Sequence, residues 1–309
     1  MTEFRGAFTA LVTPMTQSGE IDYEGFRRLI KFQITEGIDG IVPLGTTGEN
    51  PTLDDKEEDK LIDIAVEEAA AASQSGRKIP IILGAGSNDT RHMVKYVERA
   101  KKKGADAALV VTPYYNKPND DGLIRHFEAA ANVGIPIIVY NIASRTGRNI
   151  PTPLLREIAN FKNIAGVKES SGDINQVGDV IREIAIPRKN NNEKFWVLSG
   201  DDSFTLPTIC LGGDGIISVI SNLVPAKVKA LTKAALEGRY EEARAIHYSL
   251  IPLIKAAFIE TNPAPIKQAL NWAGLPAGPA RLPLGKISAA SEAVLKKAMQ
   301  EGDSHLYHL

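Results

Sequence analysis

The stretch AALVVT at residues 107–112 is short, apolar and rich in β-branched side chains, which is typical of a buried strand. Residues 122–132 follow with apolar side chains at three- and four-residue intervals, a pattern that predicts an amphipathic helix. A second short apolar run, PIIVY at residues 136–140, comes next. A strand, a helix and a strand in this order predict a parallel βαβ unit, because parallel neighbours need a crossover connection.

Short apolar runs of this kind recur along most of the chain. Six more candidate strands lie at residues 10–13, 40–44, 79–84, 164–168, 195–199 and 215–218. Amphipathic segments separate them, among them residues 23–36, 54–73 and 90–103. Eight strand-helix units in series with short connections predict an α/β fold, a (β/α)8 TIM barrel. A doubly wound open sheet would produce a similar string of elements.

The strand signals stop after about residue 221, and helical periodicity continues in residues 226–236, 240–258, 265–272 and 288–299. We therefore predict two regions. Residues 1–221 form the barrel that carries the active site, and residues 222–309 form a C-terminal helical region. The polar segment at residues 188–193 predicts a solvated loop.

The composition excludes several classes of protein. With 43% hydrophobic and 24% charged residues, the 309-residue chain is typical of a globular protein. Its net charge of −1 provides no field that would attract nucleic acid or an anionic membrane. No run approaches the roughly 20 apolar residues that span a bilayer, and no leader segment is visible, so we expect a cytoplasmic protein. The single cysteine, Cys210, and the absence of paired Cys/His spacing give no indication of a metal site.

Reactive side chains follow two of the predicted strands, at the end where barrel enzymes carry their active sites. Lys168 ends one apolar run, and an amine in such low-dielectric surroundings can lose its proton and attack a ketone to form a Schiff base. The motif G-T-T-G-E at residues 45–49 offers the hydroxyls of Thr46 and Thr47 and backbone N–H groups to a small carboxylate. A solvated lysine and an ordinary turn are the structural alternatives.

Tyrosine and arginine side chains follow two more strands. Tyr115 comes after the fourth strand and Tyr140 ends the fifth, and phenolic hydroxyls can pass protons together with threonine. Arg145 lies on the loop after the fifth strand, where it can hold a carboxylate through two parallel hydrogen bonds. Aromatic packing and a surface charge are the alternatives. Asp201 and Asp202 follow the seventh strand and predict a helix cap.

Six motifs occur in one order: G-T-T-G-E at 45–49, T-P-Y-Y-N at 112–116, Y-N at 140–141, S-R-T-G at 144–147, G-V-K-E at 166–169 and S-G-D-D at 199–202. With them the chain resembles the dihydrodipicolinate synthase (4-hydroxy-tetrahydrodipicolinate synthase) family of class I, pyruvate-dependent lyases. The resemblance covers nearly the whole chain.

The resemblance implies a role for each matching residue. Lys168 would form a Schiff base with pyruvate, Tyr140 would donate and accept protons, and Thr46 and Tyr115 would complete the relay. The remaining matches are substrate-binding positions: Thr47 for the pyruvate carboxylate, backbone groups of Gly200 and Ile217 for the pyruvate site, and Arg145 for the carboxylate of L-aspartate 4-semialdehyde. Neither a metal nor an organic cofactor is implied.

The resemblance also implies an assembly. In the family the residue that matches Tyr115 reaches into a neighbouring subunit, so a homotetramer built from two tight dimers is expected. The resemblance also implies that the enzyme acts in the diaminopimelate route to lysine. N-acetylneuraminate lyase is similar to this scaffold but typically lacks the Tyr-Tyr segment and the matching arginine. A pyruvate aldolase for another aldehyde, and a barrel that binds a 2-oxo acid without turnover, are the competing hypotheses.

Two departures from the family pattern stand out. Ala143 replaces a proline that commonly precedes S-R-T-G. Residues 54–58 contain neither the histidine nor the tryptophan that usually marks the lysine effector site, although Asn88 and Tyr114 match other effector positions. We therefore expect feedback inhibition by lysine to be weak or absent.

Overall fold

The structure is a computed structural model that describes residues 2–74 and 76–301. The described chain divides into two compact units. The first unit comprises the residues up to Gly6 together with Pro80–Ile217. The second comprises Ala7–Ile79 and the residues from Ser218 onward.

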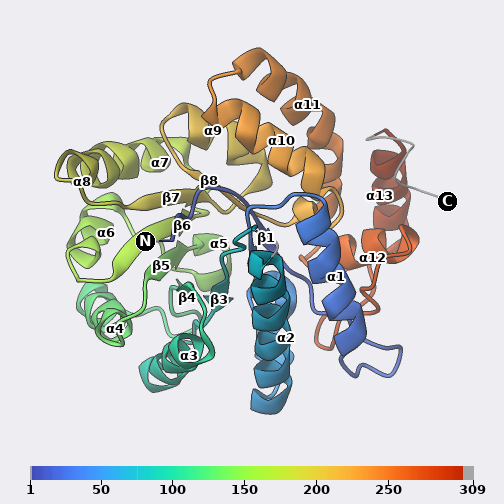
Figure 1. The fold of residues 1–309 in the computed structure, drawn as a ribbon, viewed down its shortest axis with the longest axis horizontal. Helices are drawn as coiled ribbons and strands as arrows, with labels where there is room; N and C mark the ends of the chain where they lie inside the picture. Colours follow the sequence, from blue (N-terminus) through green and yellow to red (C-terminus); the bar gives the residue numbers. More distant parts are fainter. Residues whose placement is uncertain (1, 75, 302–309) are drawn as a thin grey trace. The chain divides into compact units, whose positions relative to one another are not determined.

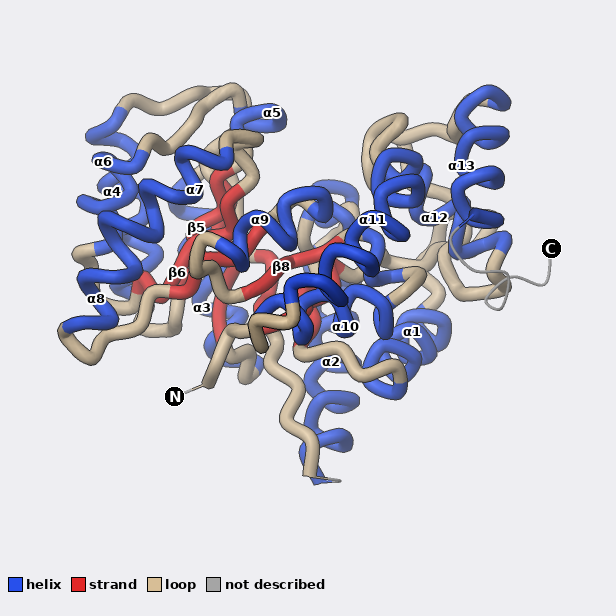
Figure 2. Tube along the Cα trace, turned by 90° about the horizontal axis from the view of Figure 1, so that it is seen from above, coloured by secondary structure: helices blue, strands red, loops and turns tan. Residues whose placement is uncertain are grey.

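The first unit alternates parallel strands with helices (Figure 1). Neighbouring strands pair in parallel from β3 to β8, for example with Leu109 opposite Ile138 and Val167 opposite Val197. Helices α4 and α6 contact each other and lie beside β5 and β6 (Figure 2). Its elements are β3 (Ile82–Gly84), α3 (Thr90–Lys103), β4 (Ala107–Val111), α4 (Asp120–Asn132), β5 (Ile137–Asn141), α5 (Ala143–Thr146), α6 (Thr152–Ala159), β6 (Ile164–Glu169), α7 (Ile174–Val180), the π-helical turn η3 (Ile181–Ala185), α8 (Ile186–Asn190), β7 (Trp196–Ser199), η4 (Asp202–Phe204), α9 (Thr205–Cys210) and β8 (Gly215–Ser218).

The second unit contains a parallel strand pair and the C-terminal helices. Strands β1 and β2 pair with Phe8 opposite Gly40. Its elements are β1 (Gly6–Ala10), α1 (Tyr23–Thr35), β2 (Gly40–Val42), the short turns η1 (Thr46–Gly48) and η2 (Asn50–Thr52), α2 (Asp55–Gln74), η5 (Ile220–Asn222), α10 (Pro225–Leu236), α11 (Tyr240–Ala257), α12 (Ala264–Trp272) and α13 (Ala289–Glu301). In the described chain the strand order is β2-β1-β8-β7-β6-β5-β4-β3, as expected for a (β/α)8 barrel.

Local sequence explains where several helices begin. Asp22, Asp89, Asn119 and Asp173 stand just before α1, α3, α4 and α7, and each side chain accepts a hydrogen bond from a backbone N–H of the first turn. These bonds satisfy donors that have no partner inside the helix. Asp201 does the same for η4, as the sequence predicted.

Aspartates fix the amino ends of the strands. Asp39, Asp106 and Asp214 each precede the first residue of a strand, and each carboxylate accepts a hydrogen bond from the backbone of a neighbouring strand segment. The donors are Ala7 N at 2.8 Å, Ile81 N at 3.0 Å and Val197 N at 2.8 Å. These three part-buried hydrogen bonds stabilise the amino ends of the strands, the end of the barrel opposite to the one where such folds carry their active sites.

Two sequence predictions about local structure are wrong. The first strand is β1, Gly6–Ala10, rather than residues 10–13. Leu11 N still donates to Val42 O of β2, but the next backbone donor, Val12 N, bonds to the Asn222 side chain, so the ladder ends there. The predicted loop at 188–193 begins inside α8. Arg188 turns inward there and donates to the carbonyls of Ile164 and Ala159, which stabilises the start of β6.

Within the described residues, none of the helices combines the length and apolar character needed to cross a membrane.

Candidate active site

Lys168 is a buried lysine near the carboxyl end of β6. Its side chain is only 6% exposed. Parallel pairing places Tyr140 of β5 opposite Lys168 on one side and Leu198 of β7 opposite it on the other. The Lys168 Nζ atom lies 4.1 Å from the centroid of the Tyr140 ring. The structure therefore places the Lys168 amine beside the Tyr140 phenol. From the sequence, Lys168 was predicted to form the Schiff base and Tyr140 to transfer protons.

Gly200 makes room for the Lys168 side chain. A Cβ atom at position 200 would overlap Ser170 Oγ and would lie 2.8 Å from Lys168 Cε. On the adjacent strand β8, the register with Ser199 opposite Ile216 carries Ile217 to the same end of the sheet, where it is buried. Gly200 and Ile217 thus lie at the carboxyl ends of neighbouring strands, as expected for residues that line a small site.

Tyr115 and Arg145, unlike this buried pair, have exposed side chains. Tyr115 has a φ of +73° and its side chain is 90% exposed. Arg145 lies on the short helix α5 and is also exposed.

The second unit holds the G-T-T-G-E turn. Thr46 is half-buried and Thr47 is buried, and both belong to η1 directly after β2. The turn is bracketed by two non-glycine residues with positive φ, Leu44 and Glu49, both at +57°. Such backbone conformations persist only where neighbouring groups impose them. One such contact comes from Thr13, whose hydroxyl donates to Gly48 O over 2.7 Å.

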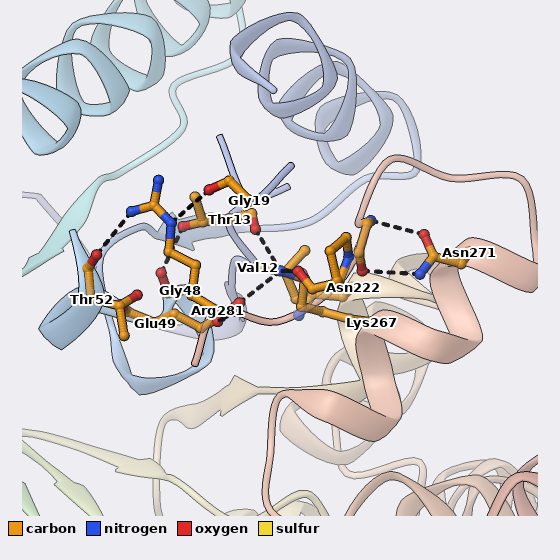
Figure 3. Close-up of polar contacts among 12 residues, drawn as sticks. Val12, Thr13, Gly19, Gly48, Glu49, Thr52, Asn222, Lys267, Asn271 and Arg281 are labelled. Atoms are coloured by element: carbon orange, nitrogen blue, oxygen red, sulfur yellow. Dashed lines mark hydrogen bonds and ion pairs between the residues drawn. The ribbon is translucent and has the colours of Figure 1, made fainter. Parts of the chain in front are cut away.

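A buried ion pair holds the end of this turn (Figure 3). Lys267 on α12 donates to Glu49 Oε1 over 2.7 Å and to the backbone carbonyls of Thr13 and Pro279. Glu49 Oε2 accepts the backbone N–H of Arg281 over 2.8 Å. Burial lowers the pKa of Lys267 from its ordinary value, and the Glu49 carboxylate opposes that shift. Three acceptors surround the Lys267 amine and hold it in place.

The sequence analysis did not single out Lys267 or its neighbour in space Asn262, which contacts Thr47. One signal was available for Lys267. It stands next to Ile266 and three residues before Leu270, two apolar positions of a predicted helix, where a charged residue is unexpected unless it has a partner.

A second buried carboxylate, Glu169, was also missed as a functional candidate. It follows Lys168 in β6 and accepts hydrogen bonds from Asn141 Nδ2, Ser171 N and Gln176 Nε2. Asn141 in turn accepts the backbone N–H of Ile150. This network closes the loop at residues 142–150, the loop that carries Arg145.

Comparison with known proteins decides the family. The model of the dihydrodipicolinate synthetase family matches residues 3–302. The chain belongs to this family. It is 50% identical over 298 residues to the 4-hydroxy-tetrahydrodipicolinate synthase of Protochlamydia amoebophila, with 96% of each chain covered. It is 46% identical to the enzyme of that name from Syntrophus aciditrophicus, with 96% of this chain and 98% of the relative covered.

Solved structures of dihydrodipicolinate synthetase family members agree. The dihydrodipicolinate synthase from Aquifex aeolicus is 44% identical, with a TM-score of 0.89 over 96% of this chain and 98% of that chain. The 4-hydroxy-tetrahydrodipicolinate synthase from Methylacidiphilum fumariolicum is 38% identical, with a TM-score of 0.91 over 99% and 100%. The predicted family, the (β/α)8 barrel fold and the enzyme class, a lyase, are confirmed.

Proposed function

We propose that this protein is a 4-hydroxy-tetrahydrodipicolinate synthase that condenses pyruvate with L-aspartate 4-semialdehyde through a Schiff base on Lys168. The observation that carries the mechanism is the buried Lys168 amine 4.1 Å from the Tyr140 ring centroid. Burial withdraws the amine from water, and a proton-transferring phenol is adjacent to it. This combination supports attack on a ketone.

The reaction begins when the Lys168 amine adds to C2 of pyruvate and water leaves, which forms an iminium ion. The positive nitrogen makes the former methyl hydrogens acidic, so loss of one proton gives an enamine. The enamine carbon attacks the aldehyde carbon of the semialdehyde, and the aldehyde oxygen takes up a proton. The amine of the second substrate then adds to the iminium carbon and displaces Lys168, which closes the ring.

The remaining roles follow from the family resemblance. Tyr140 donates and accepts the protons, and Thr46 and Tyr115 complete the relay. Thr47 holds the pyruvate carboxylate, and backbone groups of Gly200 and Ile217 line the pyruvate site. Arg145 binds the carboxylate of the semialdehyde. This chemistry uses no metal and no organic cofactor.

We further propose that the protein works in the cytoplasm, without nucleic acid or membrane partners, as a homotetramer made of two tight dimers. Tyr115 is 90% exposed, so its side chain is accessible to a neighbouring subunit. Because a 39% identical relative is described as a monomeric variant, the assembly has to be measured. Residues 1–221 form the region that carries the active site, and residues 222–309 form the C-terminal helical region.

Borohydride trapping tests the mechanism. The protein is treated with pyruvate and borohydride and its intact mass is measured, for the natural chain, Lys168→Ala and the control Lys162→Ala, which removes an exposed lysine just before β6. We expect an adduct in the natural chain and the control and none in Lys168→Ala. Turnover with aspartate semialdehyde completes the assignment. An adduct without turnover would indicate another pyruvate aldolase. The absence of any adduct would contradict a Schiff-base mechanism on Lys168.

A further inference from the structure

The hydroxyl group of Thr47 is an acceptor in this structure. Asn262 Nδ2 donates to Thr47 Oγ1 over 2.9 Å, and both residues are buried, at 5% and 3% exposure. Within residues 2–74 and 76–301, no acceptor is found for the hydrogen of the Thr47 hydroxyl. A hydroxyl has one hydrogen to give and two lone pairs. A hydroxyl whose lone pair is engaged by an amide keeps its hydrogen for another group.

The chain segment around α12 is rigidly tied to the same turn. Asn262 stands two residues before α12, and Lys267 within that helix binds Glu49, two residues after Thr47 (Figure 3). The Lys267 and Glu49 side chains are 2% and 0% exposed. A shift of Asn262 relative to Thr47 would therefore strain a buried ion pair, which is costly to break.

We propose that Asn262 is a positioning residue that directs the Thr47 hydroxyl hydrogen toward the carboxylate of the 2-oxo acid. This inference rests on the proposed function, in which Thr47 holds the pyruvate carboxylate. A carboxylate only accepts hydrogen bonds. The carboxylate is bound more tightly when the Thr47 hydroxyl is oriented to donate to it, and it receives no hydrogen bond when that hydroxyl donates to a protein group. Because Asn262 presents a donor to Thr47 Oγ1, the hydroxyl cannot donate to Asn262 Nδ2 and its hydrogen stays available for the substrate.

Steady-state kinetics of two variants test the direction of this bond. Asn262→Ala removes the donor, and we expect the KM for pyruvate to rise about tenfold with kcat within about twofold, the usual effect of one oriented hydrogen bond. Asn262→Asp keeps the shape of the side chain but offers only acceptors, so the Thr47 hydroxyl would donate to it. We expect a larger increase in KM for Asn262→Asp than for Asn262→Ala.

A double-variant comparison separates this role from a structural one. In a Thr47→Val background there is no hydroxyl to orient, so adding Asn262→Ala should change the pyruvate KM by less than about twofold. A role in packing alone would give the same increase in both backgrounds. The matched control is Asn271→Ala, which removes two hydrogen bonds between α12 and Gly278 and should leave the pyruvate KM unchanged.

The outcomes are distinct. Equal increases in the two backgrounds, or a natural pyruvate KM in Asn262→Asp, would overturn the inference while the enzyme still forms the borohydride-trapped adduct. Loss of that adduct from the natural chain would instead overturn the proposed function and this inference with it. If Asn262→Ala unfolds at the assay temperature, the near-isosteric Asn262→Asp, monitored by thermal unfolding, decides the question.

Discussion

The Lys267 ammonium group lies 2.7 Å from the Glu49 carboxylate, with both side chains withdrawn from solvent. The two residues are 218 positions apart in the chain. Glu49 ends the G-T-T-G-E turn, and Lys267 belongs to the C-terminal helix α12. The C-terminal region of the second unit is therefore part of the framework that holds a candidate substrate-binding turn.

Loss of this pair should destabilise the protein. Lys267→Met leaves the Glu49 carboxylate buried without its cation, and we expect a loss of about 3 to 5 kcal/mol in the free energy of unfolding. The double variant Glu49→Gln/Lys267→Met should recover part of this loss, because no buried charge remains unpaired. Urea unfolding followed by circular dichroism measures both. The control is Lys297→Met, which breaks the exposed pair with Glu301 and should change little. Equal effects of the two lysine substitutions would contradict the prediction.

Gly200→Ala should abolish adduct formation with pyruvate. The new methyl group would overlap Ser170 Oγ and approach Lys168 Cε within 2.8 Å, so the reactive amine would be displaced. We expect the rate of borohydride-trapped adduct formation to fall at least about 100-fold, since small displacements of a reacting group are costly. Gly178→Ala on α7 is the control, because its new methyl group would meet only Leu211 Cδ1 at 3.8 Å. Normal trapping in Gly200→Ala would show that Lys168 is less constrained than this geometry indicates.

Glu169→Gln should impair the second substrate more than the first. The carboxylate accepts from three donors, and an amide in its place would direct its own N–H toward Asn141 or Gln176. The loop that carries Arg145 would loosen, so we expect the KM for aspartate semialdehyde to rise about tenfold while the pyruvate adduct still forms. Glu183→Gln, at the surface of the same unit, serves as the control. Equal increases in both KM values would refute the specific link to Arg145.

Asp214 should make stability depend on pH. Burial raises the pKa of its carboxyl group from 3.8 to about 6, although the hydrogen bond from Val197 N and the cations Arg5, Lys194 and Lys189 oppose the shift. The folded state thus holds this proton more tightly than the unfolded state, so the contribution of Asp214 is present below pH 4 and is lost as the pH rises through 6.

The test of that dependence is the difference in unfolding free energy between Asp214→Asn and the natural chain from pH 4 to pH 8. As the pH rises, the free energy of unfolding of the variant should increase relative to that of the natural chain, by up to about 3 kcal/mol, and the difference should level off above pH 7. The asparagine Oδ1 can still accept from Val197 N. A difference that does not change with pH would mean that Asp214 titrates normally.

Lysine should inhibit the enzyme weakly or not at all. Residues 54–58 lack an aromatic or histidine side chain. Three of their carboxylates, those of Asp54, Glu57 and Glu58, accept hydrogen bonds from protein groups. Glu57 binds the guanidinium of Arg281 over 2.5 Å and 2.7 Å, and Asp54 accepts the backbone N–H groups of Lys56 and Glu57 at the start of α2. Initial rates with added lysine, and with leucine as the control, measure the effect. Half-inhibition at submillimolar lysine would contradict this expectation.

Much of the fold was predictable because burial of strands and helix faces requires local patterns of apolar residues in the sequence. The prediction of residues 215–218 as a strand and of residues 90–103 as a helix agrees with β8 and α3 to the residue. The placement of Lys168 beside Tyr140 also follows from position, since both residues lie near the carboxyl ends of strands that turned out to be neighbours. Their chemical roles remain predictions.

Local sequence accounts for the alternation of strands and helices, the helix caps and the order of the motifs, because periodicity, capping and strand ends depend on residues close together in the chain. Long-range packing sets three features that no local pattern predicts: Val12 N bonds to the Asn222 side chain, Arg188 donates to two backbone carbonyls, and Asn262 and Lys267 support the G-T-T-G-E turn. Asn262 and Thr47 are 215 residues apart. A hydrogen bond over that separation depends on how distant segments pack, and packing of this kind imposes no repeating pattern on either segment.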